Sequence, residues 1–292
     1  MSVFISALLI LLIAILLLIF YLSKQKSNKR LQAMNLSLQK QNVLIEKAHS
    51  IITSDMHKAL DYVVSLLPVK IKNDCFSTDW LFYPSSKLGG DSFGYHWLDR
   101  ENFAIYLLDV CGHGVGPALH SVSVLHVLRS GTLLNVDQRQ PEMVLSSLNT
   151  SFRMAEHNEM YFTIWYGVYN VKSRLLRYAC AGHPAPLLLA ETGEEKYLDT
   201  PNIFVGCIDD LEFKSDTTEI SKNSRLYIFS DGVYEIFKNP DEIMQLDEFY
   251  DMLKSSDNHN ENELDEIYKR LRLIQKERDF ADDFSLMKIT FT

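Results

Sequence analysis

Four aspartates stand at the ends of apolar stretches in this chain of 292 residues. Asp109 and Asp231 each follow an apolar run, Asp91 follows two glycines, and Asp282 precedes the last apolar run of the sequence. Apolar runs bounded by turn residues predict β-strands. Because the ends of neighbouring strands lie together in a sheet, we expect the four carboxylates to share one edge.

Carboxylates gathered at one edge repel one another. At ~4–5 Å and an effective dielectric constant of ~20, each pair costs about 3–4 kcal/mol. For any single Asp next to Gly, ordinary turn chemistry is the better interpretation. Four of them at strand ends favour metal binding instead, and hard oxygen ligands select Mg²⁺ or Mn²⁺. Two such ions would balance the charge of four carboxylates.

The stretches around these aspartates resemble the metal-dependent PPM (protein phosphatase 2C-like) serine/threonine phosphatases. The resemblance is to the bacterial branch of the stage II sporulation protein E phosphatase and of stress-response phosphatases that act on anti-sigma-factor antagonists. No single stretch is decisive, but their order is specific. The matching stretches are Ser65-Leu66-Leu67-Pro68, Gly89-Gly90-Asp91, Asp109-Val110-Cys111-Gly112-His113-Gly114, Phe162-Thr163-Ile164-Trp165-Tyr166-Gly167-Val168, Ala181-Gly182-His183-Pro184, Ser230-Asp231-Gly232-Val233 and Asp282-Asp283.

The resemblance implies an α+β fold, with two antiparallel β-sheets in a sandwich flanked by helices. It implies that Asp91 is a ligand of the second metal and that Asp109 bridges both ions beside the Val110 carbonyl. Asp231 and Asp282 would then be ligands of the first metal. Two Mn²⁺ or Mg²⁺ ions would hold a water that attacks phosphoserine or phosphothreonine of a protein. The family's usual target is a small anti-sigma-factor antagonist, although no residue here specifies it.

The chain departs from the family pattern at Gly94, where an Asp often follows Gly-Gly-Asp by three positions. This change keeps a second hypothesis open: a degenerate phosphatase domain that acts as a membrane-tethered binding or regulatory module. Cys111 replaces a common Ser, a mild change. His113 is predicted to support its loop, with catalysis as the minority interpretation, and His183 is predicted to be structural.

The elements that must position these residues follow from the apolar patterns. No long Pro/Gly/Ser linker or repeat interrupts residues 67–292, which we interpret as one domain. Pro141 and Pro117 suit first-turn positions of helices. The patterns predict strands over 103–110, 161–169, 175–181, 186–190, 225–230 and 284–291, and helices over 117–130, 141–157, 246–253 and 263–275.

Residues 1–23 contain no charge, and Val3 to Leu22 are almost entirely Leu, Ile, Val and Phe. Twenty helical residues reach about 30 Å, the thickness of a bilayer core. The stretch lacks the basic start and small-residue cleavage site of a signal peptide. We therefore expect a transmembrane anchor, with only two residues before it and no extracellular domain on this chain. The cluster Lys24, Lys26, Lys29 and Arg30 places the following domain in the cytoplasm.

Residues 24–66 predict a helical linker. One heptad position is apolar throughout, while its companion position includes Gln41 and Asp55. A coiled coil is apolar at both positions. Two interpretations stay open: a weak seam that forms a homodimer through residues 31–66, and a helix that packs on its own domain. The apolar position comprises Leu31, Leu38, Ile45, Ile52, Ala59 and Leu66.

Composition excludes several other functions. The formal net charge of −9 argues against nucleic acid as the partner. The four Cys are too few for a disulfide scaffold. The Gly89-Gly90-Asp91 stretch also resembles a diguanylate cyclase signature, but too little chain separates it from Pro68 to supply the half-domain that such an enzyme needs. The glycines after Asp109 match a dinucleotide loop weakly, since Pro117 takes the third glycine position.

Overall fold

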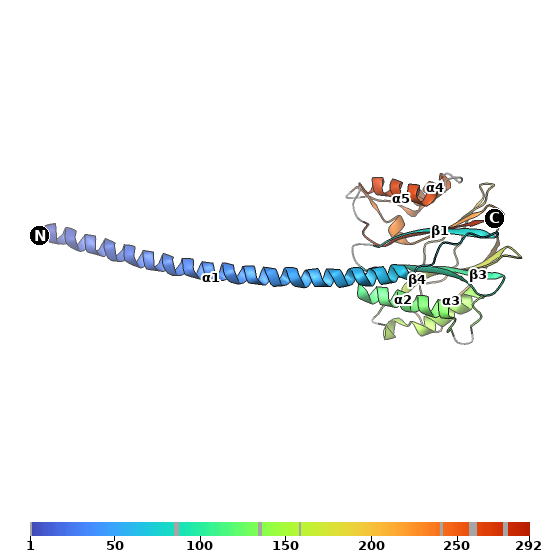
Figure 1. Cartoon of the computed structure of the whole chain (residues 1–292), viewed down its shortest axis with the longest axis horizontal. Coiled ribbons are helices and arrows are strands. Elements are labelled where there is room, and N and C mark those ends of the chain that lie inside the picture. Colours follow the sequence, from blue (N-terminus) through green and yellow to red (C-terminus); the bar gives the residue numbers. More distant parts are fainter. Residues whose placement is uncertain are drawn as a thin grey trace. The chain divides into compact units, whose positions relative to one another are not determined.

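The computed structural model describes residues 2–84, 88–133, 136–157, 159–239, 242–256, 262–276 and 280–292. The chain divides into two compact units, Met1–Lys58 and Ala59–Thr292. Figure 1 shows the long helix α1 and the elements of the second unit. The predicted domain boundary after residue 66 stays a prediction.

Helix α1, Ser2–Ser65, is one uninterrupted element. Its most apolar window has a mean hydropathy of 3.2, and none of that window is buried, so the helix is long and apolar enough to cross a membrane. In the part of the helix that follows this apolar window, Leu31, Leu38, Ile45 and Ile52 are exposed. The helix ends before Pro68, as expected from the steric restriction that proline places on preceding residues.

The second unit is a sandwich of two five-stranded antiparallel sheets, which confirms the predicted fold class. Sheet A has the order β1 (Phe76–Tyr83), β12 (Phe284–Phe291), β9 (Arg225–Phe229), β6 (Leu187–Leu189) and β7 (Glu195–Tyr197). Sheet B has the order β2 (Ser92–Trp97), β3 (Asn102–Val110), β4 (Phe162–Asn170), β5 (Leu175–Ala181) and β8 (Asp216–Glu219). A separate ribbon pairs β10 (Phe237–Asn239) with β11 (Glu242–Ile243).

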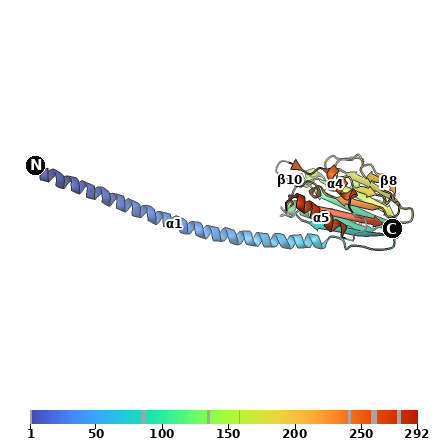
Figure 2. The same ribbon diagram turned by 90° about the horizontal axis from the view of Figure 1, so that it is seen from above.

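Helices cover the outer faces of both sheets. Helices α2 (Val115–Ser130) and α3 (Pro141–Ser151) lie against sheet B, and α4 (Leu246–Lys254) and α5 (Glu263–Ile274) lie against sheet A. Seen from above, α4 and α5 lie across the strands (Figure 2). A sheet buried on both faces needs apolar residues at successive positions. This is why β3 is apolar along most of its length rather than alternating.

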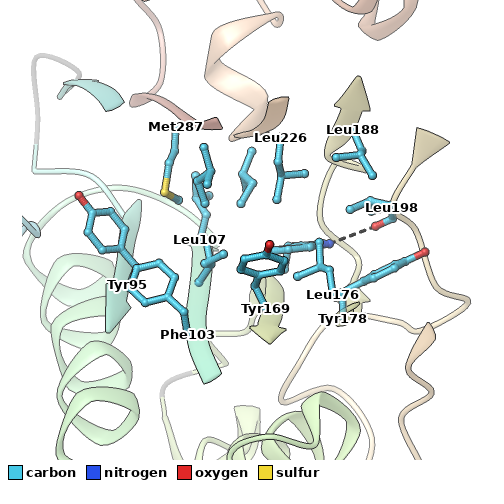
Figure 3. Packing of buried hydrophobic residues seen from close by; sticks show 14 of the residues in the cluster. Tyr95, Phe103, Leu107, Tyr169, Leu176, Tyr178, Leu188, Leu198, Leu226 and Met287 are labelled. Atoms are coloured by element: carbon cyan, nitrogen blue, oxygen red, sulfur yellow. Dashed lines mark hydrogen bonds between the residues drawn. The ribbon is translucent and has the colours of Figure 1, made fainter. Parts of the chain in front are cut away.

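Aromatic and aliphatic side chains fill the space between the sheets (Figure 3). Phe103 and Leu107 of sheet B face this layer, as does Met287 of sheet A. The indole N–H of Trp165 donates to the Leu198 carbonyl at 3.1 Å, so the largest buried ring also satisfies its polar atom. The two sheets are thereby held face to face, and their strand ends are brought to a common edge.

The expected helix over 141–157 is too long. Helix α3 ends at Ser151, and a 3₁₀ turn over Met154–Glu156 follows. The Met154 N–H donates to the Gly206 carbonyl at 3.0 Å, because tertiary contact with the 206 loop replaces the next helical turn. The edge strands β1, β7 and β8 were not predicted, because polar residues interrupt the alternation of apolar and polar residues that identifies a strand.

A buried ion network fastens α5 to sheet A. Glu263, 1% exposed, accepts hydrogen bonds from Arg225 at 3.1 Å and from the Tyr227 hydroxyl at 2.5 Å. The Ser256 hydroxyl donates to the same oxygen, and the second oxygen of Glu263 accepts from Lys288 at 3.1 Å. Every oxygen of this buried carboxylate is therefore paired, while its two cations depend on it.

Removing this carboxylate should destabilise the domain strongly. We expect Glu263→Ala to lower the free energy of unfolding by about 3–5 kcal/mol, because two cations then stay without their anion. Asp265→Ala, an exposed acid in the same first turn, is the matched control and should cost less than about 1 kcal/mol. Urea denaturation of the detergent-solubilised chain measures both. Equal losses for the two variants would contradict the role given to the network.

Candidate metal centre

The four predicted aspartates come from both sheets. In sheet B, Asp91 directly precedes β2 and Asp109 is the penultimate residue of β3. In sheet A, Asp231 begins the 3₁₀ turn η2 (Asp231–Val233) that follows β9, and Asp282 precedes β12. Within each sheet the two strand ends are antiparallel neighbours, through β2–β3 and β12–β9. Each sheet therefore contributes two carboxylates at one end.

Glycines allow the strand ends to approach closely. A Cβ added to Gly89 would lie 1.5 Å from a carboxylate oxygen of Asp283, and one added to Gly90 would lie 2.3 Å from the Val110 carbonyl oxygen. A Cβ on Gly232 would lie 2.2 Å from the backbone carbonyl oxygen of Asp283. No side chain fits at these three positions. Gly89 thus lets the Asp91 segment approach sheet A, Gly90 lets it approach the end of β3, and Gly232 brings the turn after β9 close to the segment before β12.

Asp91 is buried, at 3% exposure, and is fixed from sheet A. The Ser285 hydroxyl donates to its carboxylate at 2.5 Å, and the Asp91 backbone N–H donates to the Asp283 carboxylate at 3.3 Å. Burial, followed by the charges of Asp109 and Asp283, raises the pKa of Asp91 well above its usual range. The residue therefore belongs to a shared acidic cluster and is not an isolated turn aspartate.

The carboxylates of the two sheets interact across the edge. Burial, and then the charges of Asp231, Asp282 and Asp283, raise the pKa of Asp109 to about 8. Burial, followed by Glu235 and Asp282, raises the pKa of Asp231 to about 6. Like charges and desolvation both disfavour the ionised forms. The mutual effect on their pKa values shows that the predicted aspartates lie close to one another. Only protons or cations can offset their combined negative charge.

The donor chemistry fits a hard divalent cation. All the side chains concerned offer oxygen, which Mg²⁺ and Mn²⁺ prefer, and their excess negative charge matches a dication. Among the described residues, no three His, Cys, Asp or Glu side chains lie close enough together to form a group that could hold a metal ion. The electrostatic coupling of the carboxylates is therefore the observation that supports the site, and their roles as ligands remain proposals.

Asp283 is the site residue that sequence reasoning missed. It is 2% exposed, whereas the predicted ligand Asp282 is exposed. The Ser230 hydroxyl donates to the Asp283 carbonyl at 3.3 Å, and the Asp283 N–H donates to the Asp282 carboxylate at 2.8 Å. The adjacent pair of acids was the available signal. Which of the two turns inward depends on packing that the sequence does not display.

Gly94 is explained by its neighbour across β2–β3. It pairs with Tyr106, and a Cβ at position 94 would lie 2.6 Å from the Tyr106 hydroxyl oxygen. Tyr106 is fully buried and stacks on Tyr166 with ring centroids 5.9 Å apart. An Asp at this position would have to displace a packed ring. The departure from the family pattern therefore accompanies an aromatic core at this point of sheet B.

The loop after Asp109 is held by its backbone. Gly112 and Gly114 adopt φ values of 86° and 108°, in the left-handed region that favours glycine. The Gly114 N–H donates to the Leu88 carbonyl at 2.5 Å, and the Cys111 N–H donates to the Tyr161 carbonyl at 3.0 Å. The exposed His113 between the two glycines remains a predicted loop residue.

Comparison with known proteins agrees with this geometry. Residues 99–292 match the family model of stage II sporulation protein E (SpoIIE). "Phosphoserine phosphatase RsbP" of Bacillus subtilis (strain 168) is 31% identical over 169 residues, which cover 56% of this chain and 41% of that protein. The chain thus spans well under half the length of this curated relative.

Solved structures share the fold. The SiaA-PP2C domain of Pseudomonas aeruginosa superimposes with a TM-score of 0.69 at 17% identity, covering 84% of this chain and 99% of that domain. RsbX in complex with magnesium superimposes with a TM-score of 0.56 at 18% identity, covering 77% of this chain and 99% of that chain. At these identities the likeness establishes a PP2C-like fold.

The acidic cluster predicts how stability depends on pH without metal. Asp109 and Asp231 bind protons more tightly when folded, so the folded state holds more protons than the unfolded state and stability falls as pH rises. In EDTA, we expect the melting temperature to fall between pH 5 and pH 8 and Mn²⁺ to restore it at pH 8. Asp109→Asn should flatten this slope, while exposed Asp74→Asn should leave it unchanged. A wild-type slope in Asp109→Asn would contradict the cluster.

Proposed function

The chain belongs to the stage II sporulation protein E (SpoIIE) family, and on that premise we propose that it is a membrane-anchored, metal-dependent serine/threonine protein phosphatase. One observation carries the proposal: the buried Asp91 and the half-buried Asp109 and Asp231, which come from both sheets, are coupled at one edge, where their pKa values rise. The name of the relative RsbP supports phosphoserine as the substrate group. The complex of RsbX with magnesium supports a divalent cofactor.

In this proposal, Asp91 and Asp109 would hold one ion, and Asp109, Asp231 and Asp282 would hold the other, with the Val110 carbonyl beside Asp109. The ions, Mn²⁺ or Mg²⁺, would supply an activated water and charge stabilisation for the phosphoryl group. The chain's own contribution is orientation. Ser285 holds the Asp91 carboxylate, and the glycine contacts hold the strand ends close together.

Activity measurements test this directly. Full-length protein in detergent should dephosphorylate a phosphoserine protein with Mn²⁺ or Mg²⁺ and should stop in EDTA. Asp109→Asn should lower kcat at least 100-fold, an order of magnitude typical for loss of a group that acts on the transition state. The exposed acid Asp74, changed to Asn, should keep wild-type turnover. Turnover that survives EDTA would overturn the metal-dependent mechanism.

The alternative, a degenerate phosphatase domain that binds rather than cleaves, rests on Gly94. Glycine supplies no carboxylate at this position, and an added Cβ would lie 2.6 Å from the Tyr106 hydroxyl oxygen. The same assay separates the two functions. An inactive wild-type chain that still retains a phosphoprotein in a pull-down would favour the binding module.

We further propose that residues 3–22 anchor the chain in the cell membrane, with the phosphatase domain in the cytoplasm and its phosphorylated substrate in the same compartment. The support is an exposed apolar helix followed by Lys24, Lys26 and Lys29. A small anti-sigma-factor antagonist is the substrate class that the family resemblance suggests.

Fractionation tests the anchor. Deletion of residues 2–23 should move the protein from the membrane pellet to the supernatant after alkaline extraction, because the variant lacks the apolar segment proposed to insert into the bilayer. A cysteine-labelling reagent that cannot cross the membrane should reach the exposed Cys207 only after lysis. Labelling in intact cells would reverse the proposed orientation.

The exposed apolar residues of α1 also support the homodimer through residues 31–66 as a proposal. Leu38, Ile45 and Ile52 lie one heptad apart and are exposed to solvent. Ile45→Pro interrupts the helix and should abolish cross-linking between copies. Unchanged cross-linking would leave the alternative, a helix that packs on its own domain.

A further inference from the structure

Two aromatic rings stack on each other at the end of sheet B that carries Asp109. The ring centroids of Tyr161 and Phe204 are 4.3 Å apart, with an interplanar angle of 34°. Both residues are half-buried, and within the described part of the chain neither belongs to one of the three core clusters or packs against them. Aromatic side chains are enriched at contact surfaces between proteins. The position of this pair therefore points to contact with another polypeptide rather than to core packing.

Tyr161 projects from the same face of sheet B as Asp109. Asp109 pairs with Thr163 across β3–β4, and directly opposed residues of antiparallel strands project from one face. Two positions further along, the Cys111 N–H donates to the Tyr161 carbonyl at 3.0 Å, so the alternation of faces continues to Tyr161. Its neighbour Phe162 packs on the opposite face, in the cluster between sheet B and the helices α2 and α3. The Tyr161 side chain therefore lies on the side where the carboxylates gather.

Phe204 lies two strands away from Asp109 at the same end of the sheet. Strand β4 separates β3 from β5, and β5 ends at Ala181. The next residue, Gly182, lies against Phe204, since a Cβ added to Gly182 would be 3.1 Å from the Phe204 backbone nitrogen. Because neighbouring strands are ~4.8 Å apart, the backbones of Phe204 and Asp109 are separated by about 10 Å.

The segment that carries Phe204 is fixed on both sides. Val205 and Phe162 exchange two backbone hydrogen bonds, at 2.9 and 3.2 Å. On the other side, the Asn202 side chain donates to the Lys214 carbonyl at 2.8 Å and accepts from the Lys214 N–H at 2.7 Å. A surface that is already ordered loses less conformational entropy when it binds a partner. The half-exposed position of the Phe204 ring is therefore built into the fold.

We propose that the Tyr161–Phe204 pair, here called the aromatic platform, contacts the phosphorylated polypeptide beside its phosphoserine and selects an apolar side chain there. This inference rests on the proposed function, which places the phosphoserine at the metal centre. An extended chain advances ~3.3 Å per residue, so a side chain about three positions from the phosphoserine reaches the platform. The two rings are uncharged and largely apolar, which favours an apolar side chain over a charged one.

Binding of peptides that cannot be hydrolysed tests the platform. The probes are two fluorescein-labelled peptides with a phosphonate analogue of phosphoserine, one with leucine at the third position on each side and one with serine there. Fluorescence anisotropy of full-length protein in detergent with Mn²⁺ measures both dissociation constants. We expect the leucine peptide to bind about 10-fold more tightly to wild-type protein, the ratio that burial of one aliphatic side chain can produce.

Tyr161→Ala and Phe204→Ala should each remove most of this preference, and the double variant should lose little more, because both changes affect the same surface. Phe204→Leu keeps an apolar side chain and should retain part of the preference. Should Tyr161→Ala fail to fold, Phe204→Ala decides the outcome.

Trp97→Ala is the matched control. Trp97 is an aromatic residue that is 41% exposed, and it ends β2, whereas Asp91 precedes the start of that strand. The control variant should keep the wild-type preference for the leucine peptide. Loss of the preference in this variant as well would contradict a local contact at the platform.

Turnover of N-acetyl-phosphoserine amide, which lacks flanking side chains, distinguishes a contact surface from a structural role. The platform variants should keep its kcat and KM within about twofold of wild type, because the small substrate does not reach the rings. A large fall in kcat/KM for this substrate would assign the rings to the structure of the domain instead.

Different results would overturn this inference and the proposed function. Equal wild-type affinity for the two peptides, failure of both to bind, or a preference that survives Tyr161→Ala and Phe204→Ala would overturn the platform. Absence of turnover in a wild-type chain that prefers the leucine peptide would overturn the proposed function and leave the platform as a binding surface.

Discussion

Mutual repulsion among carboxylates gathered at one edge of the two sheets is the constraint on which this domain depends. Asp91 and Asp109 arrive from one sheet, Asp231 and Asp282 from the other, and burial together with their neighbours raises the pKa values of the first three. A fold that gathers such groups must offset their charge with protons or cations. The metal-dependent chemistry proposed for the chain follows from that requirement.

The rest of the sandwich keeps this unfavourable arrangement in place. The apolar layer between the sheets fixes them face to face, and the helices on the outer faces bury their reverse sides. At the edge, Gly89, Gly90 and Gly232 allow backbone and carboxylate atoms to approach closer than any side chain would permit. The packing of the two sheets thus keeps the carboxylates at this edge close together, although their charges repel one another.

The same edge shows how the domain differs from its family pattern. Gly94 supplies no carboxylate, and a Cβ at this position would lie 2.6 Å from the hydroxyl oxygen of the buried Tyr106. Nδ1 of the buried His183 lies 2.9 Å from the hydroxyl oxygen of Thr163, the residue that pairs with Asp109 across β3–β4.

The sequence by itself determined the fold class, the principal inner strands and the set of aspartates at their ends. These features are encoded locally, in apolar runs, glycines and the order of motifs. Tertiary structure alone decided that Asp283 rather than Asp282 turns inward, that α3 stops at Ser151, and that β1, β7 and β8 complete the sheets. The physical reason is that burial and cross-strand pairing depend on residues distant in the chain, such as Gly89 against Asp283 and His183 against Thr163. No local pattern records those contacts.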